Sequence, residues 1–150
     1  SLATHTTEQA WERIHWYRCR WIVEDYHQCL KTGCRLEQRQ VQTADRLIRL
    51  LGLLSPVAVR LVQLRDLARR TPDRPIQQVM EPAAVAIIAA RVEAKPEEMT
   101  TEAFWKAVAG LGGYLARKHD GPPGWKTLWS GWLHLQTLLE GVQLASRLRL

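Results

Sequence analysis

The sequence has few cysteines, a single phenylalanine and no long uninterrupted apolar run. Its 150 residues include three Cys. Three Cys cannot form a complete set of internal disulfides, which excludes a disulfide-stapled secreted module and favours the reducing cytoplasm as the compartment. The most apolar stretch, residues 47–64, is interrupted by Arg49, Pro56 and Arg60, so we expect no transmembrane helix. The first residues lack the basic start and apolar core of a signal peptide.

The chain is instead rich in tryptophan and in basic residues. It has seven Trp, and 21 Lys and Arg against 15 Asp and Glu give a net charge of +6. Large indole rings favour either a core or a surface that a partner covers. The positive charge favours a polyanionic partner only weakly, because many basic proteins bind no nucleic acid. With 46% hydrophobic and 24% charged residues, the composition is that of a globular protein.

Apolar residues recur at helical spacing along almost the whole chain, and no alternating strand pattern longer than four residues occurs. We therefore predict an all-α protein of about five helices, over about residues 7–31, 43–69, 82–94, 101–118 and 125–147. The second of these is apolar nearly all round, which predicts a buried helix, kinked at Pro56. The charged and Pro-containing residues 69–75 are typical of a linker. They divide the chain into two expected domains, 1–70 and 71–150.

Polar side chains share one face of the first predicted helix. With residues placed 100° apart, one stripe about 80° wide holds five of them: Tyr17, Arg20, Glu24, Gln28 and Lys31. The opposite arc is apolar and is expected to face a core. An ordinary solvent-exposed face gives the same pattern. A carboxylate flanked by cations and a phenol also suits a divalent metal bound beside phosphate oxygens. Periodicity alone does not choose between the two interpretations.

The residue types in the stripe and their exact spacing favour the second interpretation. The pattern Tyr17-x2-Arg20-x3-Glu24-x6-Lys31 resembles the signature of the insertion-sequence-four group of bacterial cut-and-paste transposases, the Tn-five-like DDE transposases. Its context, WYRCRWIVEDYHQCLKTGCRLE, is similar to that family's glutamate helix. The segment LGGYLARKHDGPPGWKTLWSGWLHLQTLLEGVQLA resembles the family's C-terminal dimerisation domain, and LLGLLSPVAVRLVQLRDLA resembles the helix between the two.

The resemblance implies a role for each residue of the stripe. In that family three carboxylates on a ribonuclease-H-like core hold two divalent metal ions for phosphodiester chemistry. Glu24 would be the third carboxylate, a catalytic ligand of Mg²⁺ or Mn²⁺, while Tyr17, Arg20 and Lys31 would contact transposon-end DNA. The implied fold is a long N-terminal helix pair from the edge of that core plus a small helical dimerisation domain. The two Asp strands that precede the Glu in the family are absent from these 150 residues, so this chain alone is not expected to cut DNA.

The last predicted helix carries the spacing of a helix–helix interface. The apolar residues recur in a 3-4-3-4-3 pattern: Trp125, Leu128, Trp132, Leu135, Leu139 and Val142. The small residues Gly131 and Gly141 could permit close backbone approach. The pattern alone fits equally well a face that packs on its own domain, whereas the resemblance implies that it pairs two transposases.

The sequence supports three hypotheses. The first is the C-terminal part of a cut-and-paste DNA transposase of the bacterial cytoplasm, which supplies the third carboxylate, contacts with the DNA end, and dimerisation. The second is a stand-alone interaction protein that forms homodimers or pairs with full-length transposase and inhibits it without catalysis. The third, a basic helical DNA-binding module, is supported only by the modest net charge.

Overall fold

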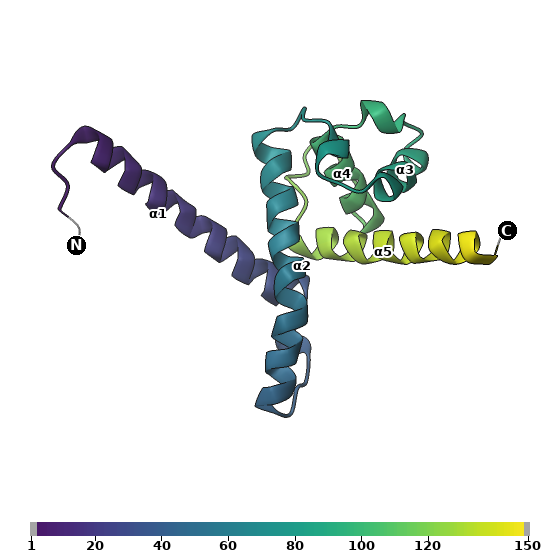
Figure 1. The fold of residues 1–150 in the computed structure, drawn as a ribbon, viewed down its shortest axis with the longest axis horizontal. Helices are drawn as coiled ribbons and strands as arrows, with labels where there is room; N and C mark the ends of the chain where they lie inside the picture. Colours follow the sequence, from purple (N-terminus) through teal and green to yellow (C-terminus); the bar gives the residue numbers. More distant parts are fainter. Residues whose placement is uncertain (1–2, 149–150) are drawn as a thin grey trace.

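The computed structural model describes residues 3–148, which form five α-helices and no β-strand within that range. The helices are α1 (Thr7–Gln28), α2 (Ala44–Arg70), α3 (Pro82–Arg91), α4 (Thr101–Leu111) and α5 (Trp125–Leu148). A π-helical turn, Cys29–Gly33, continues α1, and short 3-10 turns lie in the connections. The predicted all-α class with five helices is therefore confirmed (Figure 1).

Threonine side chains start three of the helices. The hydroxyls of Thr6, Thr43 and Thr100 each accept a hydrogen bond from a backbone N–H in the first turn of α1, α2 and α4. This satisfies one of the donors that a helix N-terminus leaves unpaired. Pro82, which has no N–H to leave unpaired, occupies the first position of α3.

Helix α4 is shorter than predicted. It ends at Leu111 rather than near residue 118, because Gly112 and Gly113 come next and Gly113 takes a φ of +94°. Glycine has no Cβ to oppose that left-handed conformation. The chain after Gly113 then forms the connection to α5.

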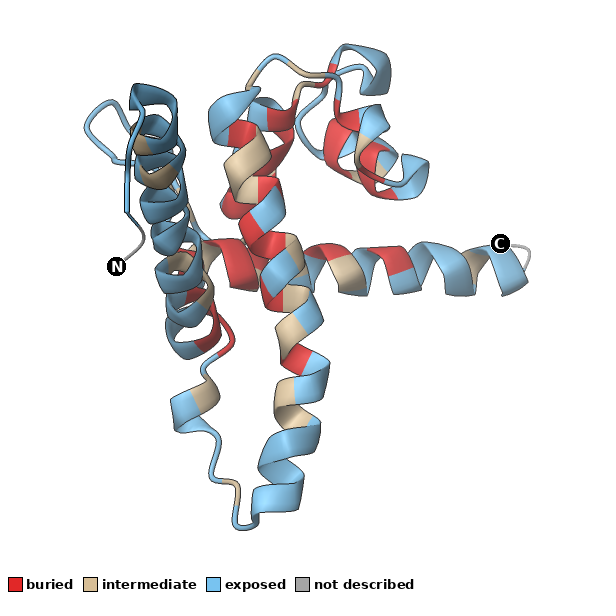
Figure 2. Ribbon diagram, turned by 60° about the vertical axis from the view of Figure 1, so that its left-hand side comes forward, coloured by how far each residue is buried: buried red, intermediate tan, exposed pale blue. Residues whose placement is uncertain are grey.

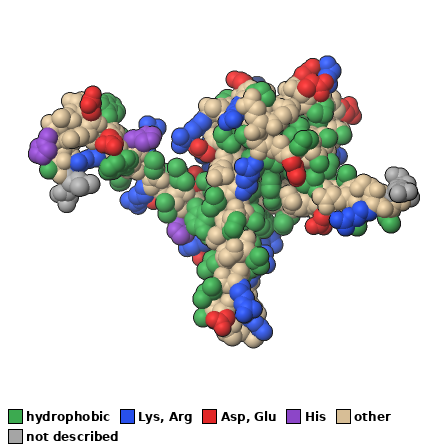
Figure 3. Space-filling view, in the orientation of Figure 1, with side chains coloured by type: hydrophobic (Ala, Val, Ile, Leu, Met, Phe, Trp, Pro, Cys, Tyr) green, Lys and Arg blue, Asp and Glu red, His purple; other side chains and the backbone are tan. Residues whose placement is uncertain are grey.

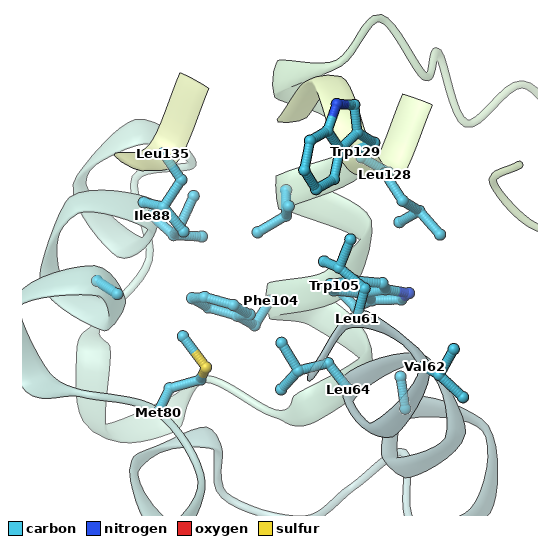
Figure 4. Close-up of a cluster of buried hydrophobic side chains, with 14 of the residues drawn as sticks. Leu61, Val62, Leu64, Met80, Ile88, Phe104, Trp105, Leu128, Trp129 and Leu135 are labelled. Carbon is cyan, nitrogen blue, oxygen red and sulfur yellow. The ribbon is translucent and has the colours of Figure 1, made fainter. Parts of the chain in front are cut away.

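Helix α2 is the element around which the others are arranged (Figure 1). Its C-terminal half packs against α4, and α3 and α5 complete a single core. In Figure 4, side chains from all four helices point into that core, among them Leu61, Ile88, Phe104, Leu128 and Leu135. Helix α1 extends away from this body, joined to it only at its C-terminal end (Figure 1).

The prediction that α2 is buried is correct only for one face of its C-terminal half, since Val59 on the other face is 44% exposed, and it is wrong for the N-terminal half. Leu47, Ile48 and Leu53 are exposed, whereas Leu61 and Leu64 are in the core (Figure 2). On length and composition alone α2 is sufficient to cross a membrane, despite the arginines in its apolar stretch. The same composition is expected of a helix that packs in a protein core, and its C-terminal half does so.

The apolar arc of the first helix, predicted to face a core, is covered only at its C-terminal end, where Tyr26 is half-buried and Cys29 and Leu30 of the following turn are buried. None of the residues of α1 is buried. The large apolar side chains exposed along it are Trp11, Ile14, Trp16, Tyr17, Trp21, Ile22 and Val23. Figure 3 shows apolar side chains beside charged groups along the projecting helix. An apolar surface of this extent is typical of a face that another protein surface covers.

Helices α4 and α5 cross at two glycines. A Cβ added to Gly131 would lie 1.8 Å from the carbonyl oxygen of Val108, and one added to Gly112 would lie 1.8 Å from that of Thr127. No side chain fits at either position, so the two backbones are in direct contact. The close approach predicted for Gly131 is confirmed, whereas a Cβ on Gly141 would meet nothing within 4 Å among the described residues.

Candidate functional site

Three of the stripe residues lie together on the exposed face of α1. An Arg20 Nη2 donates to Glu24 Oε1 at 3.1 Å, and the Arg20 guanidinium carbon lies 6.0 Å from the ring centroid of Tyr17. All three side chains are exposed to solvent. A phenol, a guanidinium and a carboxylate are thus presented side by side, and the ion pair between the last two adds little stability because it is exposed.

Lys31 departs from the position that a continuous α-helix would give it. It lies in the π-helical turn, and its Nζ pairs with Glu37 Oε1 at 3.2 Å. The turn is closed by the Cys34 N–H, which donates to the Cys29 carbonyl at 2.9 Å across five residues. A π turn adds backbone to the helix and rotates the residues after it. The spacing of 100° per residue, which placed Lys31 on the same face as Glu24, therefore does not apply beyond Gln28.

The left-handed residue that follows α1 is an arginine and not the nearby glycine. Arg35 takes the positive φ, 51°, while Gly33 packs against the start of α5, where a Cβ would lie 3.6 Å from that of Trp129. Cys29 and Cys34 are fully buried at this turn as free thiols, whereas Lys31 is exposed. The hydrogen bond with Cys34 and burial raise the pKa of the Cys29 thiol. These thiols are therefore core residues of the junction between α1 and α5.

An ion pair next to Glu24 holds the end of α1 in place. Arg65 Nη1 of α2 donates to Asp25 Oδ1 at 2.8 Å, and the same guanidinium lies 4.3 Å from the ring centroid of Trp125 in α5. Burial lowers the pKa of Arg65, and Asp25 opposes this by favouring the charged form. Sequence reasoning missed this contact, because the two residues are 40 positions apart and no local pattern links them.

The carboxylates at this face do not make up a metal centre by themselves. Glu24 borders an open hollow together with Trp21, Asp25, Gln28 and Arg69. Asp25 is engaged by Arg65, and Glu24 is paired with Arg20. Across residues 3–148 no three His, Cys, Asp or Glu side chains gather closely enough to hold a metal ion. Both carboxylates already pair with an arginine, so the residues present do not fit a Mg²⁺ or Mn²⁺ site without further oxygen ligands.

The predicted interface on α5 divides into two parts. Trp125, Leu128, Leu135 and Leu139 are buried in the core of the chain itself, so they have no surface to offer a partner. Trp132 is half-buried, and Val142 is 52% exposed. The division arises because α3 and α4 cover only the N-terminal part of α5 and leave the rest projecting (Figures 1 and 2).

Apolar residues continue along the projecting part of α5. Leu138 is 42% exposed, and Leu144 is also exposed. Leu128, Leu135 and Val142 are spaced seven residues apart, which places Val142 on the same face as the two core leucines. The apolar stripe therefore runs out of the core into solvent.

Comparison with known protein families matches most of the chain to a described family. Residues 56–149 match the family described as the transposase Tn5 dimerisation domain. The matched range begins within α2 at Pro56 and includes α3, α4 and α5, so it covers the core and the projecting helix. It accounts for more than half of the chain, which shows the family rather than a local similarity. The chain belongs to the Tn5 transposase dimerisation-domain family, and its role in transposition is one of dimerisation.

Proposed function

We propose that the chain pairs with a second copy of itself, or with a full-length transposase, through the projecting half of α5. The observation that supports this most directly is the apolar stripe that leaves the core after Leu139, with Leu138 and Val142 exposed beside and beyond it. A stripe of this spacing is typical of helix pairs. Trp132, half-buried at the edge of the core, extends the proposed interface toward the body of the protein.

Replacing both Leu138 and Val142 with glutamate is expected to abolish self-association. Both side chains are already exposed, so the folded monomer should tolerate the change, whereas an interface would have to bury two unpaired charges. We expect dimer affinity to fall by about a hundredfold or more, measured by sedimentation equilibrium. A matched control replaces the exposed Val92 and Leu115, away from α5, and should leave the affinity unchanged. Unaltered association of the Leu138/Val142 variant would remove this surface from the interface.

We further propose that Glu24 contributes one carboxylate to a divalent-metal site of a DNA transposase, completed by residues outside these 150. Tyr17, Arg20 and Lys31 would contact transposon-end DNA. The grouping of phenol, guanidinium and carboxylate on one exposed face supports this, since cations and hydroxyls contact phosphates. The uncovered apolar arc of α1 supports a neighbouring catalytic core, which would bury Trp21 and Ile22. Mg²⁺ or Mn²⁺ would supply the charge that activates the attacking oxygen in such a site.

A second candidate function is inhibition by pairing. This function is favoured because Glu24 is the only carboxylate of the stripe and residues 3–148 contain no complete metal site. A chain with a dimerisation surface alone can associate with a partner without catalysis. It would occupy the α5 surface of a full-length transposase and prevent two active copies from pairing. The intact mass of the native protein separates the two: 17.2 kDa favours inhibition, and a larger mass favours the catalytic role.

A further inference from the structure

A further pocket lies beside Arg65, and Arg69 borders both this pocket and the hollow next to Glu24. Residues of α2, of α4 and of the connection between α4 and α5 surround a volume of about 390 Å³. That connection runs alongside α2 in Figure 1. The volume is within the range of sites that take small ligands, about 300 to 1,000 Å³. None of Tyr17, Arg20, Glu24 or Lys31 borders this pocket.

The charge of the pocket is positive, and two of its cations have no carboxylate partner among the described residues. Four basic side chains line it, Arg65, Arg69, Lys106 and Arg117, against two acidic ones, Glu102 and Asp120. Glu102 pairs with Lys106 at 2.8 Å, and Asp120 accepts the backbone N–H of Arg117 at 2.8 Å. With Arg65 held by Asp25, the guanidinium groups of Arg69 and Arg117 remain without an ion pair within residues 3–148.

Aromatic side chains also border the pocket. Trp105 lines the pocket and is only 5% exposed, and its indole N–H has no hydrogen-bond partner in the described part of the chain. This nitrogen is itself enclosed by protein atoms, so the Trp105 ring contributes an apolar surface to the pocket. The pocket wall also includes the ring of Tyr114. Its hydroxyl donates to the Gly121 carbonyl at 2.8 Å, a hydrogen bond within the connection between α4 and α5. The pocket thus combines cationic side chains with an aromatic wall formed by Trp105 and Tyr114.

We propose that this pocket binds a nucleotide unit, with its phosphate between Arg69 and Arg117 and its base or sugar against Trp105 and Tyr114. Guanidinium groups bind phosphate oxygens through paired, charge-assisted hydrogen bonds. An anion would also relieve the repulsion between the neighbouring guanidinium groups of Arg69 and Arg65. The same chemistry is offered by a free nucleotide and by one unit of a nucleic-acid strand. The proposal does not depend on dimerisation or on Glu24.

Titration of the full chain with adenosine monophosphate, followed by calorimetry, tests the pocket. We expect saturable binding that is tighter than that of inorganic phosphate, since phosphate alone does not use the aromatic wall. The variant with both Arg69→Gln and Arg117→Gln should lose affinity by about tenfold or more. Arg91→Gln with Arg147→Gln removes the same charge from exposed positions outside the pocket and should keep the affinity unchanged.

The outcomes separate the sources of the nucleotide and can overturn the proposal. A short single-stranded oligonucleotide that binds and is displaced by adenosine monophosphate indicates a unit of a strand, while binding of the monophosphate alone indicates a free nucleotide. Both support the pocket. Absence of binding by either probe overturns it, as does an equal loss in the two double variants. Circular dichroism of each variant checks that the fold is retained, which we expect because Arg91, Arg117 and Arg147 are exposed and Arg69 is at the surface of α2.

Discussion

Replacing Gly131 with alanine is expected to lower the free energy of unfolding by about 3 kcal/mol, enough to unfold a marginally stable domain. The added Cβ would lie 1.8 Å from the carbonyl oxygen of Val108 and 2.8 Å from the carbon that bears it. These are backbone atoms of α4, so no side-chain rotation relieves the clash. The two helices must separate, which opens the core around Phe104 and Leu128. Urea unfolding followed by far-ultraviolet circular dichroism measures the effect.

Gly141 provides the matched control in the same helix. A Cβ there would contact nothing within 4 Å of the described residues, so alanine only removes the conformational freedom of glycine. We expect Gly141→Ala to raise the free energy of unfolding by about 0.5 to 1 kcal/mol. Equal stability of the Gly131→Ala variant and the parent protein would show that α4 and α5 do not cross at this position.

Replacing Glu24 with glutamine in a complete transposase is expected to lower metal-dependent DNA cleavage by about a thousandfold or more. Glutamine keeps the size of the side chain and a carbonyl that accepts from Arg20, so the face that we propose for DNA is preserved. It lacks the negative charge that binds a divalent cation. Binding of transposon-end DNA, measured without metal by fluorescence anisotropy, should change little.

The control for this substitution is Glu12→Gln. Glu12 is exposed on the same helix, about 140° around it from Tyr17, and should not approach a site that Glu24 shares. Its replacement removes the same charge and should leave cleavage unaltered. Retained cleavage in the Glu24 variant, or an equal loss in both variants, would exclude Glu24 as a metal ligand.

Local sequence signals predicted the elements of the fold well. The predicted starts of four helices are close to the observed ones. They follow from Thr43, Pro82 and Thr100 and from the apolar spacing that begins at Trp125, because caps and prolines act on the backbone beside them. The glycines after Leu111 ended α4 earlier than expected. Gly33 lies in close packing against α5, which local sequence signals do not distinguish from a left-handed turn.

The partner that covers each apolar face could not be predicted, because periodicity identifies a face and not its partner. The arc of α1 around Ile22 and the stripe of α5 through Leu135 have similar spacing, yet the first is exposed and the second is buried. The π turn also had no signal in the sequence. Gly33 in this turn packs against α5, and the turn takes Lys31 off the helical spacing that grouped it with Glu24. The bond between Arg65 and Asp25 depends on the same long-range packing.

Cross-linking at Val142 tests most directly whether α5 pairs two copies of the chain. In a Cys19→Ser background, Val142→Cys carries the one exposed thiol, since Cys29 and Cys34 are fully buried. If the projecting halves of α5 face each other, a short bismaleimide should convert this variant to a covalent dimer. The matched Leu115→Cys variant, exposed on the connection before α5, should stay monomeric under the same conditions. A Val142→Cys variant that dimerises in solution but cross-links no faster than Leu115→Cys would contradict an interface on this helix.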